Sequence, residues 1–385
     1  MTIVTVVQFL IVVTVVFFLV VNMAYLVKIP SVTGPLHSSP FISVCVPARN
    51  EERGVGACLR SLLAQNYPHF EVIAIDDNST DATGAIISAL AAEDPRLTAI
   101  HGAPLPEGWL GKPYALHQAW QRARGDYILF TDADPVFLPN ALSSAMYVMQ
   151  ANDVDALTLM PGTEFGSFWE RAIQPVIFGF IGALTRFKKV NSRDNPSAMG
   201  VGAFMMFKRE VYARLGGHER VRREIIEDVA LAHHVKKEGF KLLVADGKAI
   251  YSIRMYHSLR EIWEGWRKNI FVAMKQSVLR TCYYALLIMC FVVTPYWVFI
   301  LDLMRGTGLS VLSFTALFLS LMTGIGLCGE LQLEKRYVFL FPLGALVMSA
   351  LMINSMVQAL FKGRGEWRGR SCLLPEDQPA NNKRE

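Results

Sequence analysis

Acidic residues follow two short apolar runs in this chain, at points where a strand would end. One run leads into Asp76 and Asp77, and a second leads into Asp132 and Asp134. Two carboxylates on one turn, as at Asp132 and Asp134, offer the oxygen ligands that suit Mg²⁺ or Mn²⁺, which commonly bridge to substrate phosphates. Because acidic residues are common in turns, the residues around this pair must decide whether it binds a metal.

Several other residues have the chemistry to accompany a metal-bound phosphate. The carboxylate of Asp77 could accept hydrogen bonds from a nucleobase or ribose, while Asp76 braces the turn. Lys112, between glycine and proline, could meet phosphate charge, although a solvated surface lysine is the alternative. Glu227 and Asp228 open a predicted helix, where the helix dipole favours acids, so a capping role competes with a catalytic one.

The elements that must position these residues alternate along the chain. The spacing predicts strands at 41–47, 71–75, 97–101 and 126–131, with helices at 55–64, from Ser79 or Thr80 as N-cap to about 92, and at 113–124. Such alternation predicts an α/β fold with a mostly parallel sheet covered on both faces. Ligands bind beyond the carboxyl ends of such strands, so both acidic clusters are predicted on one rim.

The segment after the second acidic cluster is more varied. We expect a strand at 203–207, a helix at 209–215 ended by Gly216 and Gly217, and a helix at 226–238 stopped by Gly239. Between them, residues 166–190 hold a charge-free core too short to span a bilayer. That segment is predicted to be either a helix lying in the membrane interface or a buried helix of a soluble domain.

Apolar residues make up 52% of the 385 residues, too many for an ordinary soluble protein. They concentrate in four charge-free runs near or above the length of a spanning helix, at 2–27, 281–301, 306–329 and 337–361. The first run lacks a basic start and a cleavage site, so we interpret it as a retained anchor. The predicted domains are an anchor (1–28), a catalytic domain that begins with a linker at 29–40 (29–278), about three C-terminal spans (279–362) and a basic tail (363–385).

Charge and cysteine content favour a membrane protein with its catalytic domain on the cytoplasmic side. The net charge is only +5, and basic residues cluster beside the apolar runs, as at Arg186, Lys188 and Lys189. This placement suits anionic lipid headgroups and argues against nucleic acid as a partner. The six cysteines show no zinc or redox spacing. Three trailing spans would leave the basic tail outside, against the positive-inside tendency, so the span containing Pro295 or Pro342 could be re-entrant.

Together these motifs resemble the family 2 glycosyltransferases, which are inverting enzymes with a GT-A fold. The resemblance covers about residues 41–271 and rests on an ordered set of motifs: Val44–Glu51, Val72–Asp81, Gly111-Lys112, Asp132-Ala-Asp134, Gly202-Ala-Phe with Gly216-Gly217, and Glu227-Asp228. It implies a nucleotide-diphosphate sugar bound by Pro47, Glu51, Asp77, Lys112 and Asp132, a Mg²⁺ or Mn²⁺ ion at Asp132 and Asp134, and Asp228 as general base.

The segment after the predicted base departs from the processive members of that family. It reads Glu261-Ile-Trp-Glu-Gly-Trp-Arg-Lys-Asn269, which looks more like the hopanoid-associated and carotenoid (diaponeurosporenoate-type) glycosyltransferases of bacteria. The resemblance implies a membrane-bound enzyme with a lipid acceptor, and Glu227, Trp266, Arg267 and Lys268 are its predicted acceptor or interface residues. A processive polysaccharide synthase and a non-catalytic membrane scaffold are the alternatives.

Overall fold

The computed structural model describes residues 2–34, 38–305, 311–362, 364–367 and 370–373. The chain forms two compact units. Leu19–Glu164 and Gly182–Met255 make up the sheet unit, whereas Met1–Phe18, Phe165–Ile181 and Tyr256–Glu385 make up the helical unit. The sheet unit ends at Met255. The catalytic domain was predicted to extend to residue 278, and that boundary stays a prediction.

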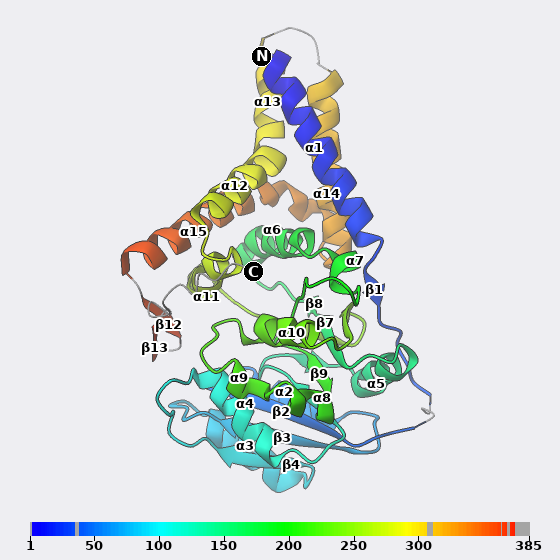
Figure 1. Cartoon of the computed structure of the whole chain (residues 1–385). Helices are drawn as coiled ribbons and strands as arrows, with labels where there is room; N and C mark the ends of the chain where they lie inside the picture. The colour runs from blue at the N-terminus through cyan, green and yellow to red at the C-terminus, as the bar shows by residue number, and fades with distance from the viewer. Residues whose placement is uncertain (1, 35–37, 306–310, 363, 368–369, 374–385) are drawn as a thin grey trace, which may run out of the picture. The chain divides into compact units, whose positions relative to one another are not determined.

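The sheet unit is built on one eight-stranded sheet, in the order β1-β10-β7-β9-β5-β2-β3-β4 (Figure 1). Its strands are β1 (Val27–Lys28), β2 (Ile42–Ala48), β3 (Phe70–Asp76), β4 (Leu97–His101), β5 (Tyr127–Phe130), β7 (Ala156–Met160), β9 (Met205–Lys208) and β10 (Leu242–Asp246). All neighbouring pairs are parallel except those that β9 makes with β5 and β7. The prediction of a mostly parallel sheet is therefore confirmed.

Helices cover both faces of this sheet because both faces of its strands are apolar. Along β2, Val44 and Val46 enter one buried core, whereas Cys45 enters the other. The first core is closed by α2 (Val55–Leu63), α3 (Thr83–Glu93) and α5 (Ala141–Ala151), and the second by α4 (Gly111–Arg122), α8 (Arg209–Arg214) and α10 (Glu227–Lys237). A small second sheet joins β6 (Val136–Phe137), β11 (Tyr251–Ile253) and β8 (Gly162–Thr163).

One local prediction, the start of the helix after β3, was wrong. The helix after β3 begins at Thr83 with Ala82 as its N-cap, because the Ser79 hydroxyl accepts from the Asn50 amide instead of capping the helix. The predicted linker that begins at Ile29 makes two bonds in the sheet unit, since the amide of Ile29 donates to the Asp246 carbonyl and the amide of Val32 donates to the Ser144 hydroxyl. Just before it, Val27 and Lys28 form an edge strand.

Among the residues that the structure describes, four helices are long and apolar enough to cross a membrane: Ile3–Met23, Val278–Met304, Val311–Glu330 and Lys335–Phe361. They correspond to α1 (Thr2–Met23), to α12 (Val278–Ile288) with α13 (Thr294–Met304), to α14 (Val311–Glu330), and to the 3₁₀ segment η2 (Lys335–Leu340) with α15 (Phe341–Lys362). They match the four predicted runs, although residues 306–310, and most of the tail beyond the short strands β12 (Arg364–Trp367) and β13 (Arg370–Leu373), lie outside the described residues.

Both prolines in the trailing runs lie where a helix begins. Pro295 is in the first turn of α13, directly after a π-helical segment, η1 (Met289–Val293). Pro342 is the second residue of α15 and follows η2. Because proline lacks an amide hydrogen, it is tolerated in a first turn, and the neighbouring π or 3₁₀ geometry absorbs the missing bond.

The remaining helices include α6 (Phe168–Leu184), α7 (Phe187–Val190), α9 (Gly217–Arg220) and α11 (Leu259–Ala273). The predicted helix at 166–190 is thus two helices, and α6, with its 17 residues, is not among the four that could span a membrane. In the first half of α6, Glu170 and Ala172–Ile177 are buried. This burial suits a packed helix better than one resting on a lipid surface.

Candidate active site

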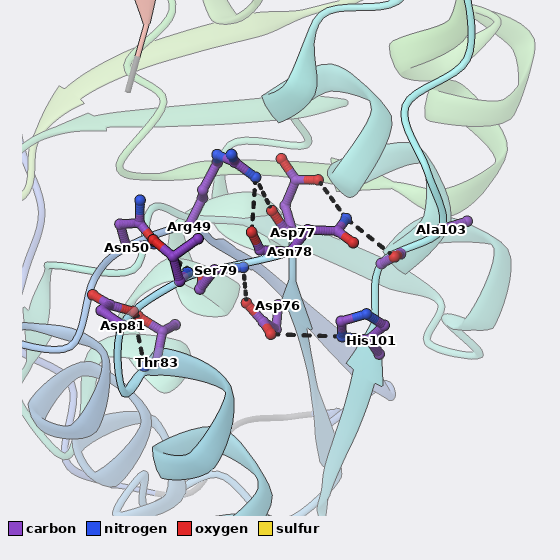
Figure 2. Close-up of polar contacts among 12 residues, drawn as sticks. Arg49, Asn50, Asp76, Asp77, Asn78, Ser79, Asp81, Thr83, His101 and Ala103 are labelled. Atoms are coloured by element: carbon purple, nitrogen blue, oxygen red, sulfur yellow. Dashed lines mark hydrogen bonds and ion pairs between the residues drawn. The ribbon is translucent and has the colours of Figure 1, made fainter. Parts of the chain in front are cut away.

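The turn that follows β3 holds its shape through bonds between side chains and the backbone (Figure 2). The carboxylate of Asp76 accepts from the amide of Ser79 at 3.0 Å, so Asp76 braces the turn as predicted. Arg49, from the end of β2, donates through Nη1 to the carbonyls of Asp77, at 2.5 Å, and Asn78, at 3.0 Å. We call residues 76–81 the β3 turn.

Left-handed backbone at Asn78 sets the direction of the chain through the β3 turn. Its φ is 55°, a region that asparagine tolerates better than most residues, and its side chain donates to the Gly102 carbonyl at 3.2 Å. The neighbouring Asp77 is only 2% exposed, and its amide donates to the carbonyl of Ala48. Asp77 is therefore fixed beside the end of β2.

Two residues predicted to bind the nucleotide sugar, one on β2 and one just after it, lie next to this turn. Pro47 pairs with Ile75 in the register of β2 and β3 and is half-buried. The amide of Glu51 donates to the Thr83 hydroxyl at 2.8 Å, which ties the end of β2 to the start of α3. Pro47, Glu51 and Asp77 thus meet at neighbouring strand ends, as expected for parallel strands.

A cluster of ionised side chains lies beyond β5, at the starts of α4 and α10. Lys112 Nζ is 2.6 Å from Asp132 Oδ1 and 2.7 Å from Glu227 Oε1. Burial lowers the pKa of Lys112, but the charges of Asp132, Glu227 and Asp228 outweigh it and hold that pKa well above its usual range. We call these four residues the charge centre, in which Lys112 is a paired cation and not a solvated surface lysine.

Asp228 is oriented by two backbone amides. Its Oδ2 accepts from the amide of Gly202 at 2.7 Å, and its Oδ1 accepts from the amide of Val229 at 2.8 Å. Burial, and then the charge of Glu227, raise the pKa of Asp228 to about 7, although Lys112 and the two amides lower it. A carboxyl group with that pKa can accept a proton near neutral pH.

Gly202 makes room for this arrangement. A Cβ atom at that position would be 2.8 Å from Lys112 Nζ, 3.3 Å from Asp228 Oδ2 and 3.5 Å from Asp132 Oδ2. A methyl group there would clash with the Lys112 ammonium unless that side chain moved, and it would lie close to the Asp228 carboxylate. The glycine also shows that Asp132 and Asp228 border the same small space.

Asp132 and Asp134 fit a divalent cation by charge and ligand type. Burial, and then the charges of Asp134, Asp132 and Glu51, raise the pKa of the Cys58 thiol well above its usual range, so these carboxylates contribute negative charge next to this thiol. Among the described residues, no three His, Cys, Asp or Glu side chains form a ready-made metal site. Two carboxylates suffice for Mg²⁺ or Mn²⁺ when substrate phosphates complete the coordination.

Comparisons with known proteins agree with the resemblance found in the sequence. Residues 43–216 match the family described as Glycosyl transferase family 2. That match, together with relatives named as glycosyltransferases, shows that the protein is a glycosyltransferase. It is 26% identical over 358 residues to the 4,4'-diaponeurosporenoate glycosyltransferase of Staphylococcus aureus strain MRSA252, over 88% of this chain and 89% of that one. The enzyme of the same name from strain USA300 is equally similar.

A solved structure supports the same fold. The mannosyltransferase PcManGT from Pyrobaculum calidifontis, in complex with GDP-Man and Mn²⁺, superposes with a TM-score of 0.51 and 19% identity. The match covers 92% of this chain and 99% of that one. The sheet unit thus has the GT-A fold that the sequence predicted.

One buried pair in this glycosyltransferase was missed in the sequence. Tyr212 and His218 lie behind the charge centre, with the Tyr212 hydroxyl 2.5 Å from Nδ1 of His218 and accepting from the His218 amide at 2.9 Å. Burial, and then the charge of Lys112, lower the pKa of His218 to about 3, so the ring is neutral. The Gly216-Gly217 pair before it was interpreted as a helix stop and as part of the family motif, and neither interpretation pointed to this histidine.

A small cavity separates His218 from the start of α10. Its volume is about 10 Å³, and His218, Gly202, Glu227 and Asp228 are among the residues that line it. A space of this size holds about one water molecule when polar groups surround it. This cavity therefore borders Glu227 and Asp228 of the charge centre.

The predicted acceptor residues other than Glu227 belong to the helical unit. Trp266 is 8% exposed and packs its ring against Phe178 and Tyr256, with centroids 6.0 and 6.2 Å apart. Arg267 and Lys268 follow on α11, and the carbonyl of Arg267 accepts from the Ser355 hydroxyl. A buried indole is poorly placed to anchor a membrane surface, and the acceptor role of these residues stays a prediction.

Proposed function

We propose that this glycosyltransferase moves a sugar, with inversion, from a nucleotide-diphosphate sugar to a lipid acceptor while bound to a membrane. The observation that carries the proposal is Asp228, a carboxyl group with a pKa near neutrality, aligned by two amides beside the Lys112–Asp132 ion pair. A base oriented in this way suits removal of a proton from an acceptor hydroxyl.

The donor would occupy the strand ends. Asp77, Pro47 and Glu51 border the β3 turn and suit the nucleoside, and Lys112 with Asp132 suits the diphosphate. Asp132 and Asp134 would hold Mg²⁺ or Mn²⁺, which supplies positive charge to a leaving diphosphate. The Pyrobaculum enzyme, solved with GDP-Man and Mn²⁺, supports a metal-bound nucleotide sugar as the donor class.

The reaction is a single displacement. The acceptor oxygen forms a bond to the anomeric carbon while the bond from that carbon to the phosphate oxygen breaks, and its electron pair leaves with the nucleoside diphosphate. Asp228 takes the proton of the acceptor hydroxyl, so no covalent bond to the protein forms. Lys112 is already paired with Asp132 and Glu227, and its ammonium group would also stabilise the negative charge of the diphosphate.

Two observations support a lipid acceptor and a membrane location. Four helices are long and apolar enough to span a bilayer, and the Staphylococcus relative is named for diaponeurosporenoate, which suggests an apolar acceptor. We also propose that the sheet unit faces the cytoplasm. Exposed cations at Lys28, Arg186, Lys188 and Lys189 are grouped near the carboxyl end of α1, which agrees with the positive-inside tendency.

The proposal is tested by comparing lipid extracts from cells with and without the gene by mass spectrometry, and then by transfer assays with the purified protein. We expect a glycolipid that disappears with the gene, and turnover that requires Mg²⁺ or Mn²⁺. Asp134→Ala should abolish both turnover and metal-dependent nucleotide binding, whereas Glu93→Ala, an exposed carboxylate at the end of α3, should not. A polymeric product, or full activity of Asp134→Ala, would contradict the proposal.

A further inference from the structure

The end of the first candidate span is bonded to the turn between α6 and α7. Asn22, in the last turn of α1, donates through Nδ2 to the carbonyls of Gly182, at 3.0 Å, and Thr185, at 2.7 Å. Its Oδ1 accepts from the amide of Phe187 at 3.1 Å. Asn22 is only 6% exposed, so this clamp is shielded from water.

The clamp brings together basic residues that are far apart in the sequence. Arg186, Lys188 and Lys189 surround Phe187, whose amide Asn22 binds, and Lys28 follows α1 on β1. All four cations are exposed, and no ion pair among the described residues involves them. We call these four residues the basic collar.

The α7 helix holds the collar in a fixed orientation. Phe187 is fully buried and Val190 is 3% exposed, so the intervening Lys188 and Lys189 must face outward. Lys188 Nζ also lies 5.0 Å from the centre of the Tyr25 ring, which is just beyond the end of α1. The collar therefore stays next to the end of the span.

The length of α1 places the collar at the level of lipid headgroups. The candidate span Ile3–Met23 has 21 residues, and at about 1.5 Å per residue it matches a hydrocarbon core of about 30 Å. Asn22 is then at the boundary between hydrocarbon and headgroups. This step rests on the proposed membrane location of the protein.

We propose that the basic collar binds the headgroups of anionic phospholipids in the leaflet that faces the sheet unit. A lipid phosphate carries the complementary charge and is the group that a collar at this depth meets at high local concentration. Each cation near an anionic surface strengthens binding about fivefold. Nucleic acid is a poor occupant, because four cations beside a bilayer do not form an extended basic stripe.

The proposal is tested first by the accessibility of the collar lysines. Full-length protein is reconstituted in nanodiscs of phosphatidylcholine alone, or with about a third of phosphatidylglycerol to supply anionic charge. Acylation of Lys188 and Lys189 by an amine reagent is followed by peptide mass spectrometry, with the exposed Lys237 as internal reference. We expect labelling to fall severalfold in the anionic discs and to recover at about 0.5 M salt, which screens the attraction.

Equal labelling in both kinds of disc would overturn the proposal. A third arm adds inorganic phosphate to the phosphatidylcholine discs, and protection there equal to that in anionic discs would show a free-phosphate site instead of a lipid one. None of these measurements needs turnover. Unprotected collar lysines in an enzyme that transfers sugar would overturn only the collar. Protected lysines in a protein that transfers no sugar would overturn only the proposed function.

A charge-reversed variant supplies the second test. Lys188→Glu with Lys189→Glu should lose most of the phosphatidylglycerol that copurifies with the protein, measured by lipid mass spectrometry per mole of protein. The matched control is Arg122→Glu with Lys237→Glu, which changes the net charge by the same amount at exposed positions on α4 and α10. This control should retain the copurifying phosphatidylglycerol. Equal retention by both variants would refute the collar.

Discussion

The β3 turn and the charge centre follow different strands of one sheet, but they are built by different means. In the β3 turn, Arg49 and Asp76 bond backbone carbonyls and amides, so its shape is complete before any ligand enters. In the charge centre, Lys112 bonds the carboxylates of Asp132 and Glu227, so ionised groups balance one another. The β3 turn therefore suits a ligand that is recognised by its shape. The charge centre suits a charged ligand that replaces some of the ion pairs of Lys112.

The largest effect is expected at the base. Asp228→Asn keeps one acceptor oxygen, for either the Gly202 or the Val229 amide, but it cannot take a proton, so transfer should fall by about 10² to 10⁴ while donor binding survives. Turnover rates and calorimetric donor titration measure the two quantities. A loss of donor affinity with an unchanged rate constant would make Asp228 a binding residue.

Removing the positive charge of Lys112 should reduce activity less than Asp228→Asn does, but it should affect both donor binding and the transfer rate. In Lys112→Met the carboxylates of Asp132, Glu227 and Asp228 lose their counter-ion, so we expect donor affinity and turnover each to fall by about tenfold or more. Lys112→Arg, which keeps the charge, is the control, and circular dichroism checks the fold. Wild-type affinity in Lys112→Met would mean that the lysine serves only stability.

The pH dependence tests the charge centre without a substitution. Because the pKa of Asp228 is raised to about 7, its basic form is lost as the pH falls through that value. The transfer rate should therefore decrease about tenfold for each pH unit below 7 and level off above it. The pH–rate profile of Asp228→Asn should not show this decrease below pH 7. If it does, another group is responsible for the decrease.

The smallest effect is expected in the β3 turn. Arg49→Lys keeps a charge but cannot reach two carbonyls with a planar fork. We expect the KM for the donor to rise about threefold to tenfold with little change in kcat, because the turn loosens away from the reacting atoms. Arg60→Lys, on the exposed side of α2, is the matched control. A fall in kcat alone would show that the two regions are not separable.

Much of this site could be predicted from sequence because it depends on local patterns. Strand ends mark Asp77 and Asp132, and the start of a helix marks Asp228, so their shared rim follows from parallel topology. The cap of α3 was misplaced because Ser79 has a partner on another strand, Asn50, which no local pattern shows.

The parts that were missed depend on contacts between distant segments. Nothing near Gly202 in the sequence reveals that Lys112 and Asp228 approach it, and the Tyr212–His218 bond needs the sheet to bury both residues. The clamp at Asn22 joins residues about 160 positions apart. A polar residue near the end of an apolar run was the one available signal, and it does not name a partner.

The bonds of Asn22 and the pairing of β1 with β10 also bear on what happens when the chain is cut. Within the sheet unit, the end of α1 is held by three bonds at Asn22 and by the β1–β10 ladder, as well as by the peptide that follows. A protease that nicks the segment at 30–40 would leave two fragments that remain associated. The N-terminal fragment would therefore stay bound until these bonds break, for example when the sheet unit unfolds.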